Sequence, residues 1–490
     1  MNALVWSLLL AGLGGDDGGA STDRPLIQAD APRPVRELPP GDAAVRSSTA
    51  LLSLDVVIDS TLETYPVLLA ARADVEAADG DRLAAAGAFD PQWRTRAWNV
   101  PIGSYPQTRV DTIIEAPTPL WGTSFFGGYR FGSGKIQSYY GERETWSLGE
   151  LRAGAVVPLI RNGPIDRRRA TEARAVLAQS IAGLSRQQQE LELVRLATNR
   201  YWEWVAAGTR RAVARALFDI ARERDAQLAT RAGVGDVAEF DRQDNKRALV
   251  QREALLVQAQ RGVEQAALEL SLFLRDGEGN PRMPIDDELP RLPDSLLTPD
   301  VDLDAALARR PDVARLLDQK RAAEVELRFQ QNQLLPSLDV GIAVSGDLGT
   351  RSAESYTPTQ GTELEINAVL EVPLLFRAPV GRIQASRAAL SKIDTQLRLA
   401  RDRVSVEVRD GQSALKAALE RVTLARQEVE VSLQLERGER KRFELGDGSL
   451  LFVNLREQTT VEARLREVDA LLDGQRALAS MRAALALAVR

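Results

Sequence analysis

Two hydrophobic periods occur along the chain, and each predicts a different kind of element. In 337–345 one face carries only aliphatic side chains, namely Leu338, Val340, Ile342 and Val344. In 364–374 the alternation returns, and the second face is polar at Glu365, Asn367 and Glu371. A period of two predicts β-strands. The hairpin within 336–374 is therefore either an ordinary half-buried hairpin or part of a membrane barrel with a wet lumen.

A helical period fills most of the remaining chain. From Pro164 to about residue 231 no proline interrupts almost 70 residues, and apolar side chains recur at Leu177, Ile181, Leu184 and Leu191. Such a helix measures about 100 Å and cannot fold into one globule. The segments 236–274, 380–444 and 449–489 have a similar character. They predict two long helical hairpins that turn at Gly233–Gly235 and at Gly446–Gly448.

The two halves of the chain follow the same order. Pro66 and Pro91 correspond to Pro311 and Pro336, each 245 residues later. Two further pairs follow in the same order. The Val-Pro-Leu segments 157–159 and 372–374 are 215 residues apart, and the paired glycines of the two turns are 213 residues apart. We therefore predict two internal repeats. Residues 51–274 would hold a helix, a β-hairpin at 91–159 and a long helical hairpin; residues 301–490 would hold a helix, a β-hairpin at 336–374 and a second helical hairpin.

Other segments connect or precede the repeats. Residues 275–300 are rich in proline, aspartate and glycine and form the predicted linker. The apolar stretch 3–13 has the size of a signal peptide but no basic residues before it, so a signal peptide within 1–20 and a chance apolar N-terminus both stay open. The proline-rich residues 21–50 predict an extended tether. The region 91–159 holds many aromatic residues, as expected either at a membrane interface or in a sheet core.

Composition excludes several kinds of chemistry. The chain has no cysteine and no histidine, which removes thiolate nucleophiles, histidine-based triads and Cys/His zinc sites. Its net charge of −6 gives no basic surface for nucleic acid. The glycine-rich segment 128–136 lacks the first glycine and the Ser/Thr of a phosphate loop. We therefore predict no enzyme, no catalytic residue, no metal site and no cofactor.

Taken in order, these features resemble the TolC-like outer-membrane efflux family. The resemblance spans about Leu51 to Ala488. It rests on the duplicated order of elements, the Arg-Pro-Asp-Val segment 310–313 with the later Leu-Pro-Ser-Leu segment 335–338, the paired Val-Pro-Leu segments and the glycine turns. It implies a mostly α fold with a membrane β-barrel portion. Three chains would share a 12-stranded barrel, two hairpins each, continued by an α-helical coiled-coil tunnel.

The resemblance also implies a function and partners. The protein would be a homotrimer in the bacterial outer membrane that contacts lipid and extends into the periplasm. It would be the passive channel of a tripartite efflux or type I secretion system. A periplasmic adaptor (membrane fusion) protein would connect it to an inner-membrane transporter that delivers the substrate. The alternative is a non-membrane coiled-coil structural protein, which explains the helices but not the alternating strands. Drug, metal and protein cargo all stay open.

Two groups of site residues follow from the resemblance. The helical turns would dock the adaptor through Gly233, Val234, Gly235 and Asp236 and through Gly446, Asp447, Gly448 and Ser449, unless these glycines only turn the chain. The periplasmic gate would involve Asn454, Glu457 and Asp241. Three copies of Glu457 would place three carboxylates at a narrow mouth and attract cations. A solvated helix face, or pairing with Arg456 or Arg464, is the alternative for Glu457. Leu450 stands where relatives have a basic gate residue.

Overall fold

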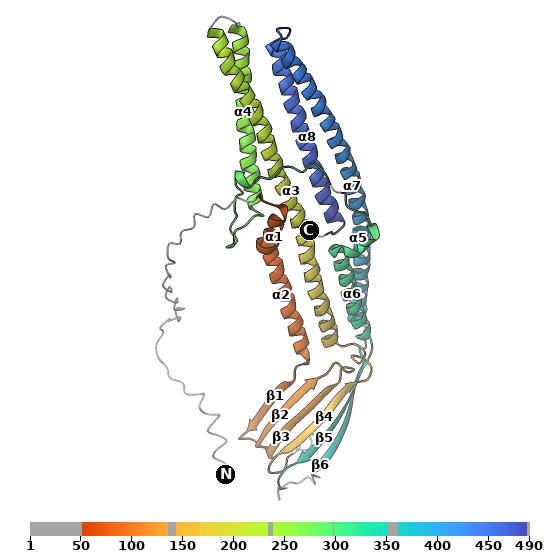
Figure 1. The fold of residues 1–490 in the computed structure, drawn as a ribbon. Helices are drawn as coiled ribbons and strands as arrows, with labels where there is room; N and C mark the ends of the chain where they lie inside the picture. Colours follow the sequence, from red (N-terminus) through yellow and green to blue (C-terminus); the bar gives the residue numbers. More distant parts are fainter. Residues whose placement is uncertain (1–50, 136–143, 234–238, 297, 351–360, 488–490) are drawn as a thin grey trace, which may run out of the picture. The chain divides into compact units, whose positions relative to one another are not determined.

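Long helices extend from one end of a single antiparallel sheet in the computed structural model (Figure 1). The structure describes residues 51–135, 144–233, 239–296, 298–350 and 361–487. The predicted signal peptide and tether, and Val234, Gly235 and Asp236 of the first helical turn, lie outside the described residues.

The sheet has six strands, hydrogen-bonded in sequence order with every neighbouring pair antiparallel. The strands are β1 (Gln92–Val100), β2 (Gln107–Pro117), β3 (Ser124–Gly134), β4 (Glu150–Pro158), β5 (Ser337–Asp347) and β6 (Thr362–Glu371). The region 91–159 therefore contains four strands, two more than one hairpin has; the length of this region had left the number of its strands open. Pairing of β4 with β5, as in Val157 opposite Val340, joins the two halves of the chain in one sheet.

A tight turn at 118–123 creates one of the additional strand pairs. The backbone N–H of Thr118 donates to the carbonyl oxygen of Thr123 at 2.9 Å, and this closes the turn between β2 and β3. Gly122 adopts a φ of 68°, a left-handed conformation that glycine adopts readily. A Cβ at this position would lie 2.6 Å from the carbonyl oxygen of Asn162. Both constraints favour glycine here.

The first half of the helical part contains α1 (Leu54–Thr64), α2 (Pro66–Ala86), α3 (Arg167–Gly233) and α4 (Glu239–Ser271). The second half contains α5 (Leu303–Arg309), α6 (Pro311–Asn332), α7 (Arg377–Glu444) and α8 (Leu450–Ala484). Short 3-10 turns occur at Gly87–Phe89 and Asp286–Glu288. Pro66 and Pro311 begin α2 and α6 because proline fits the first helical turn and keeps the preceding residue extended.

Two helices run the whole length of the helical part. α3 has 67 residues and α7 has 68, which corresponds to about 100 Å each. Near the sheet they are accompanied by α2 and α6, and farther from it by α4 and α8 (Figure 1). The helical part therefore combines α2, α3, α6 and α7 near the sheet and α3, α4, α7 and α8 toward the tips. Among the described residues, no helix combines the length and the apolarity needed to cross a membrane.

The largest hydrophobic core lies where the helices meet the connector at 272–302. Trp204 and Val205 of α3 and Leu270 of α4 are buried in it together with residues of α7 and α8. Two connector leucines cover helical glycines: a Cβ at Gly208 would collide with Leu289, and a Cβ at Gly474 would collide with Leu296. The connector thus contacts both hairpins closely. A second core joins α5, α6, α7 and the end of α8 around Val404, Val408 and Met481.

Candidate functional site

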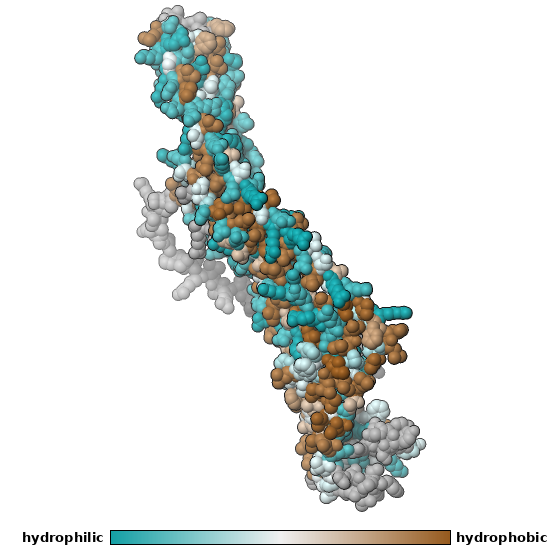
Figure 2. Space-filling model, turned by 90° about the vertical axis from the view of Figure 1, so that its right-hand side faces the viewer, coloured by the Kyte–Doolittle hydropathy of each residue, from teal (hydrophilic) through white to brown (hydrophobic). Residues whose placement is uncertain are grey.

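One face of the sheet has no charged side chain among the described strand residues. The strand registers bring together Ile114, Phe125, Ala155, Val340, Ile342, Leu364, Ile366 and Leu370 with further small, aliphatic, aromatic and hydroxyl residues and the amide Asn99. Ile342 is 48% exposed and Ile366 is 66% exposed. Hydrophobic side chains gather toward the sheet end of the face in Figure 2, whereas the end of the helical part far from the sheet is mostly hydrophilic. An exposed apolar surface of this kind suits contact with lipid.

The opposite face carries the charges. It presents Arg94, Arg96, Arg109, Asp111, Glu115, Arg130, Glu150, Arg152, Asp339, Asp347, Glu363, Glu365 and Glu371. Some of these residues form ion pairs across strands, such as Arg152 Nη2 to Asp111 Oδ2 at 3.1 Å and Arg130 Nη1 to Glu150 Oε2 at 3.6 Å. The structure places the residues of β5 and β6 on the two faces that the alternation predicted, because Ile342 pairs with Ile366 while Glu365 lies opposite Ala343. One sheet therefore separates an apolar face from a charged face.

The turn between α7 and α8 is built from backbone contacts. Gly446 has a φ of 81°, and its N–H donates to the carbonyl oxygen of Phe443 at 3.1 Å. A Cβ at Gly448 would lie 2.8 Å from the backbone nitrogen of Phe443. The Ser449 side chain accepts from the N–H of Leu451 and caps α8. These glycines and this serine have a structural role, whatever else the turn binds.

Apolar side chains are exposed beside this turn. Leu445 is 75% exposed, and Leu451, Phe452 and Leu455 are each more than half exposed. Phe240, near the start of α4, is 81% exposed. Of the residues predicted at the first turn, only the end of α3 at Gly233 is described. None of these five exposed residues was among those predicted for the tips.

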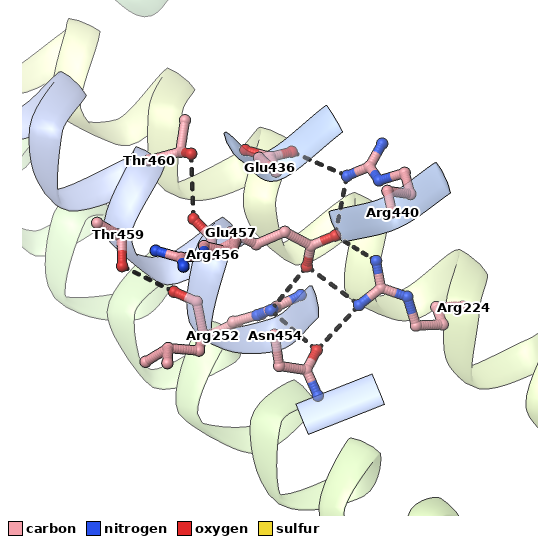
Figure 3. Close-up of polar contacts among 10 residues, drawn as sticks. Arg224, Arg252, Glu436, Arg440, Asn454, Arg456, Glu457, Thr459 and Thr460 are labelled. Carbon is pink, nitrogen blue, oxygen red and sulfur yellow. Dashed lines mark hydrogen bonds and ion pairs between the residues drawn. The ribbon is translucent and has the colours of Figure 1, made fainter. Parts of the chain in front are cut away.

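A buried carboxylate lies below the second turn. Glu457 of α8 is 1% exposed and contacts arginines from the three other long helices: Arg224 of α3, Arg252 of α4 and Arg440 of α7 (Figure 3). Arg224 Nη1 lies 3.0 Å from Oε2, Arg252 Nη2 lies 2.9 Å from Oε2, and Arg440 Nη2 lies 2.8 Å from Oε1. Glu457 thus connects both helical hairpins.

Asn454 belongs to the same cluster. Its Oδ1 accepts from Arg224 Nη1 at 2.9 Å and from Arg252 Nη2 at 3.3 Å. The only other carboxylate drawn with the cluster is that of Glu436, which accepts from Arg440 at 2.9 Å (Figure 3). Three guanidinium groups therefore face two carboxylates.

The cluster keeps Glu457 ionised. Burial alone would raise the pKa of Glu457, but the hydrogen bonds and charges of Arg224, Arg252 and Arg440 outweigh it and lower the pKa below its ordinary value. Burial lowers the pKa of Arg252, and the negative charge of Glu457 opposes this change. Removing one partner from such a cluster leaves buried charges without compensation, which is strongly destabilising.

Two further ion pairs connect α3 with α8. Arg210 Nη2 lies 2.6 Å from Asp469 Oδ1, and Arg476 Nη2 lies 3.2 Å from Glu203 Oε2. The side chain of Asp469 is 52% exposed and that of Glu203 is 33% exposed. Exposed pairs contribute little because water screens them. Of these α3–α8 ion pairs, that of Glu457 is the most buried and the nearest to the tip.

The predicted gate residues lie in surroundings that differ from those expected. Glu457 points into the core of its own chain, so a ring of exposed carboxylates at a mouth is not the arrangement found. Its partners are also not Arg456 or Arg464, which were the alternative. Leu450 is buried at 4% exposure. Asp241 lies in α4, but its side chain is outside the described part of the structure. A role of Asn454, Glu457 and Asp241 in gating stays a prediction.

Arg224, Arg252 and Arg440 were not among the predicted site residues, although the sequence contains a signal for such a cluster. Arg224 lies on the α3 seam formed by the buried residues Leu217, Ala221 and Leu228. Glu457 continues a seam on α8 that includes Leu450, Val453 and Val461. A charged residue at a seam position must be paired when it is buried. The sequence could have indicated oppositely charged residues on facing seams, but not which pairs meet.

Comparison with known proteins supports the fold. No protein-family model and no curated protein matches the sequence. Among solved structures, the open state of the MtrE outer membrane channel of Neisseria gonorrhoeae has a TM-score of 0.63 and 16% identity and covers 96% of this chain and 97% of its own. A membrane protein of Pseudomonas aeruginosa has a TM-score of 0.62 and 15% identity, and the match covers 92% of this chain and 99% of that protein.

The outer membrane protein VceC of Vibrio cholerae gives a similar result. Its TM-score is 0.62 at 14% identity, with 89% of this chain and 97% of that chain covered. These likenesses extend over nearly the whole length of each structure. The chain therefore has the fold of bacterial outer-membrane channel proteins.

Proposed function

We propose that this protein is a channel of the bacterial outer membrane that extends into the periplasm. The observation that carries the proposal is the sheet with one exposed, charge-free face and one charged face, continuous with helical hairpins about 100 Å long. The apolar face suits lipid and the charged face suits a water-filled lumen. The shared fold with outer-membrane channel proteins supports the same function.

The channel is a homotrimer built from two repeats per chain. A single sheet has two open edges, and a bilayer does not tolerate unpaired backbone groups, so other chains must complete the barrel. The helical hairpins of the three copies form the periplasmic tunnel. No step of bond making or breaking is assigned to the protein, which acts as a passive conduit.

The channel works within a tripartite efflux or type I secretion system. An inner-membrane transporter delivers the substrate, and a periplasmic adaptor contacts the helical tips. Exposed Leu451, Phe452 and Leu455 beside the second turn support a protein-binding role for the tip, since clustered exposed apolar side chains commonly mark interaction sites. Gly446, Asp447, Gly448 and Ser449 shape this surface, with Gly233, Val234, Gly235 and Asp236 at the other turn.

Gating is assigned to the region of Asn454 and Glu457, with Asp241 nearby in α4. In the conformation described here, Glu457 couples α8 to α3 and α4. Movement of one hairpin away from the other would have to break these buried ion pairs. The cluster therefore favours a closed arrangement of the hairpins near the tip.

The alternative function is a non-membrane coiled-coil structural protein. It accounts for the long helices but leaves the exposed apolar face of the sheet without a purpose. Cell fractionation separates the two functions. We expect the full-length chain in the outer-membrane fraction, extracted only by detergent, whereas recovery from a soluble cytoplasmic fraction would refute the channel.

A further inference from the structure

The number of strands in one chain sets the width of the barrel. β1 to β6 form one continuous sheet, and β1 and β6 are its outer strands. Among the described residues, each outer strand has a neighbour on one side only. Both edges must be paired before the sheet can lie in lipid.

The two edges are suited to pair with each other in separate copies. Because the sheet has an even number of antiparallel strands, β1 and β6 run in opposite directions. β6 of one copy beside β1 of the next therefore continues the antiparallel alternation. β1 has 9 residues and β6 has 10, so the two ladders also match in length.

The charges on the two edges are opposite. On the charged face, β1 carries Arg94 and Arg96, whereas β6 carries Glu363, Glu365 and Glu371. The register through the four inner strands places these five side chains on the same face of the sheet. β1 begins and β6 ends at the helical side of the sheet, so a β6–β1 seam would bring Arg94 and Arg96 toward the end of β6 that carries Glu371. Opposite charges on neighbouring strands are stabilising.

We infer that three copies of this chain close a barrel of eighteen strands, three times the six of one sheet. The inference rests on the proposed channel function and deepens it, because it replaces the expected 12-stranded barrel by a wider one. With strands about 4.8 Å apart and tilted by about 40°, eighteen strands give a backbone diameter of about 36 Å. Twelve strands would give about 24 Å.

The helical part of the chain fits the wider barrel. Six tilted strands cover an arc of about 38 Å. Four helices side by side, such as α2, α3, α6 and α7 above the sheet (Figure 1), cover about 32 to 40 Å at the usual spacing of helix axes. Four strands would cover only about 25 Å. The six-stranded sheet therefore continues the helical wall without narrowing it.

The wider barrel changes which solutes can pass. The membrane segment would admit polymers and peptides that a 12-stranded barrel of the same fold would exclude. The narrowest point of the conduit then lies in the helical part, where the Glu457 cluster couples the hairpins. Size selection would be a property of the helical tips rather than of the barrel.

Disulfide cross-linking tests the strand number directly, because the natural chain contains no cysteine. The first set of variants carries Thr95→Cys in β1 together with Leu364→Cys, Ile366→Cys or Ala368→Cys in β6, which covers several seam registers. The matched set carries Phe131→Cys in β3 with the same β6 positions. In an eighteen-stranded barrel β3 lies between β2 and β4 and never meets β6.

Each outcome has a clear meaning. We expect cross-links in the β1–β6 set and none in the β3–β6 set, with a ladder on denaturing gels that ends at three chains. A ladder ending at two chains, or cross-links in the β3–β6 set, would indicate twelve strands and overturn the inference while the channel stands. Recovery of the chain as a soluble monomer without cross-links in either set would overturn the channel itself.

Pore size gives an independent measurement without cysteine substitutions. In planar bilayers, graded polyethylene glycols are added only on the barrel side of channels opened by Glu457→Gln, so that their entry reports the width of the membrane segment. A 12-stranded channel of the same fold, opened in the same way, is the reference. We expect entry of polymers that the 12-stranded reference excludes. An identical size cut-off would argue against the wider barrel.

Discussion

The guanidinium of Arg224 on α3 contacts both carboxylate oxygens of Glu457 on α8, with Nη1 3.0 Å from Oε2. The two residues are separated by 233 positions and belong to different helical hairpins. Glu457 is 1% exposed, so this contact lies in the core rather than on a solvated surface. Its integrity should therefore control how the two hairpins move relative to each other near the tip.

Replacing Glu457 by glutamine should loosen the hairpins. The variant leaves Arg224, Arg252 and Arg440 buried without their carboxylate, which typically costs about 3–5 kcal/mol. We expect a lower unfolding temperature and a higher open probability in single-channel recordings. Glu462→Gln, at an exposed position on the same helix, is the matched control and should behave like the natural protein. A Glu457→Gln variant with unchanged stability and gating would refute the coupling role.

The same cluster predicts a dependence of stability on pH. The pKa of Glu457 is lowered, so the folded chain keeps this carboxylate ionised at pH values where the unfolded chain would protonate it. Its stabilisation is fully present above the ordinary glutamate pKa of about 4.3 and is lost as the pH falls through the lower folded value. The unfolding temperature of the natural protein should fall steeply in that acidic range.

Comparison with Glu457→Gln isolates this group from the other carboxylates. The variant lacks the titrating side chain, so the difference in unfolding temperature between the two proteins should shrink as the pH falls below about 4. A difference that stays constant over the whole range would show that the ionisation of Glu457 does not stabilise the fold.

The two faces of β5 should tolerate charge differently. Ile342 is exposed on the apolar face opposite Ile366 of β6, and Ile342→Arg should cost about 2–4 kcal/mol if it lies near the bilayer midplane. Asp339→Asn, on the charged face of the same strand, should cost little. The yield of heat-resistant trimer in outer-membrane fractions measures both effects. Equal tolerance of the two substitutions would contradict the assignment of the faces.

The exposed residues of the second tip should be needed for export but not for assembly. Phe452→Glu removes an exposed apolar side chain and should abolish or strongly reduce export while trimers still form. A bulky residue at Ser449 is a less specific test, because it also removes the cap of α8, worth about 1 kcal/mol. Ser449→Asp keeps a capping side chain and serves as the control. Normal export by Phe452→Glu would show that the exposed tip residues are not needed for export and that the tip only turns the chain.

The sequence predicted the parts of the fold that repeat a period. β5 and β6 were found because Leu338, Val340, Ile342 and Val344 alternate strictly with small or polar residues. The extra strands at 91–159 escaped because glycines interrupt the alternation in β3, where Gly127, Gly128 and Gly132 occur among the aromatic residues. β1 does alternate, because Arg94 and Arg96 lie on one face of the strand and Trp93 and Thr95 on the other. The sequence therefore contained a signal for this strand.

The site was less predictable than the fold because it depends on contacts between distant segments. The position of Glu457 two to three helical turns from Gly448 follows from the sequence. Whether its side chain faces a lumen or a core depends on how α8 rotates against α3 and α4, and no local pattern determines that rotation. Arg252, which is 205 residues away in sequence, shows how far the decisive partner can be.

Conductance of the purified full-length protein in planar lipid bilayers tests the central proposal most directly. We predict stable ion-conducting pores in preparations that contain the trimer. Single-channel openings should be more frequent in Glu457→Gln than in Glu462→Gln. Purified protein that assembles into trimers and inserts into lipid but never conducts, in either variant, would contradict the proposal that this chain forms an outer-membrane channel.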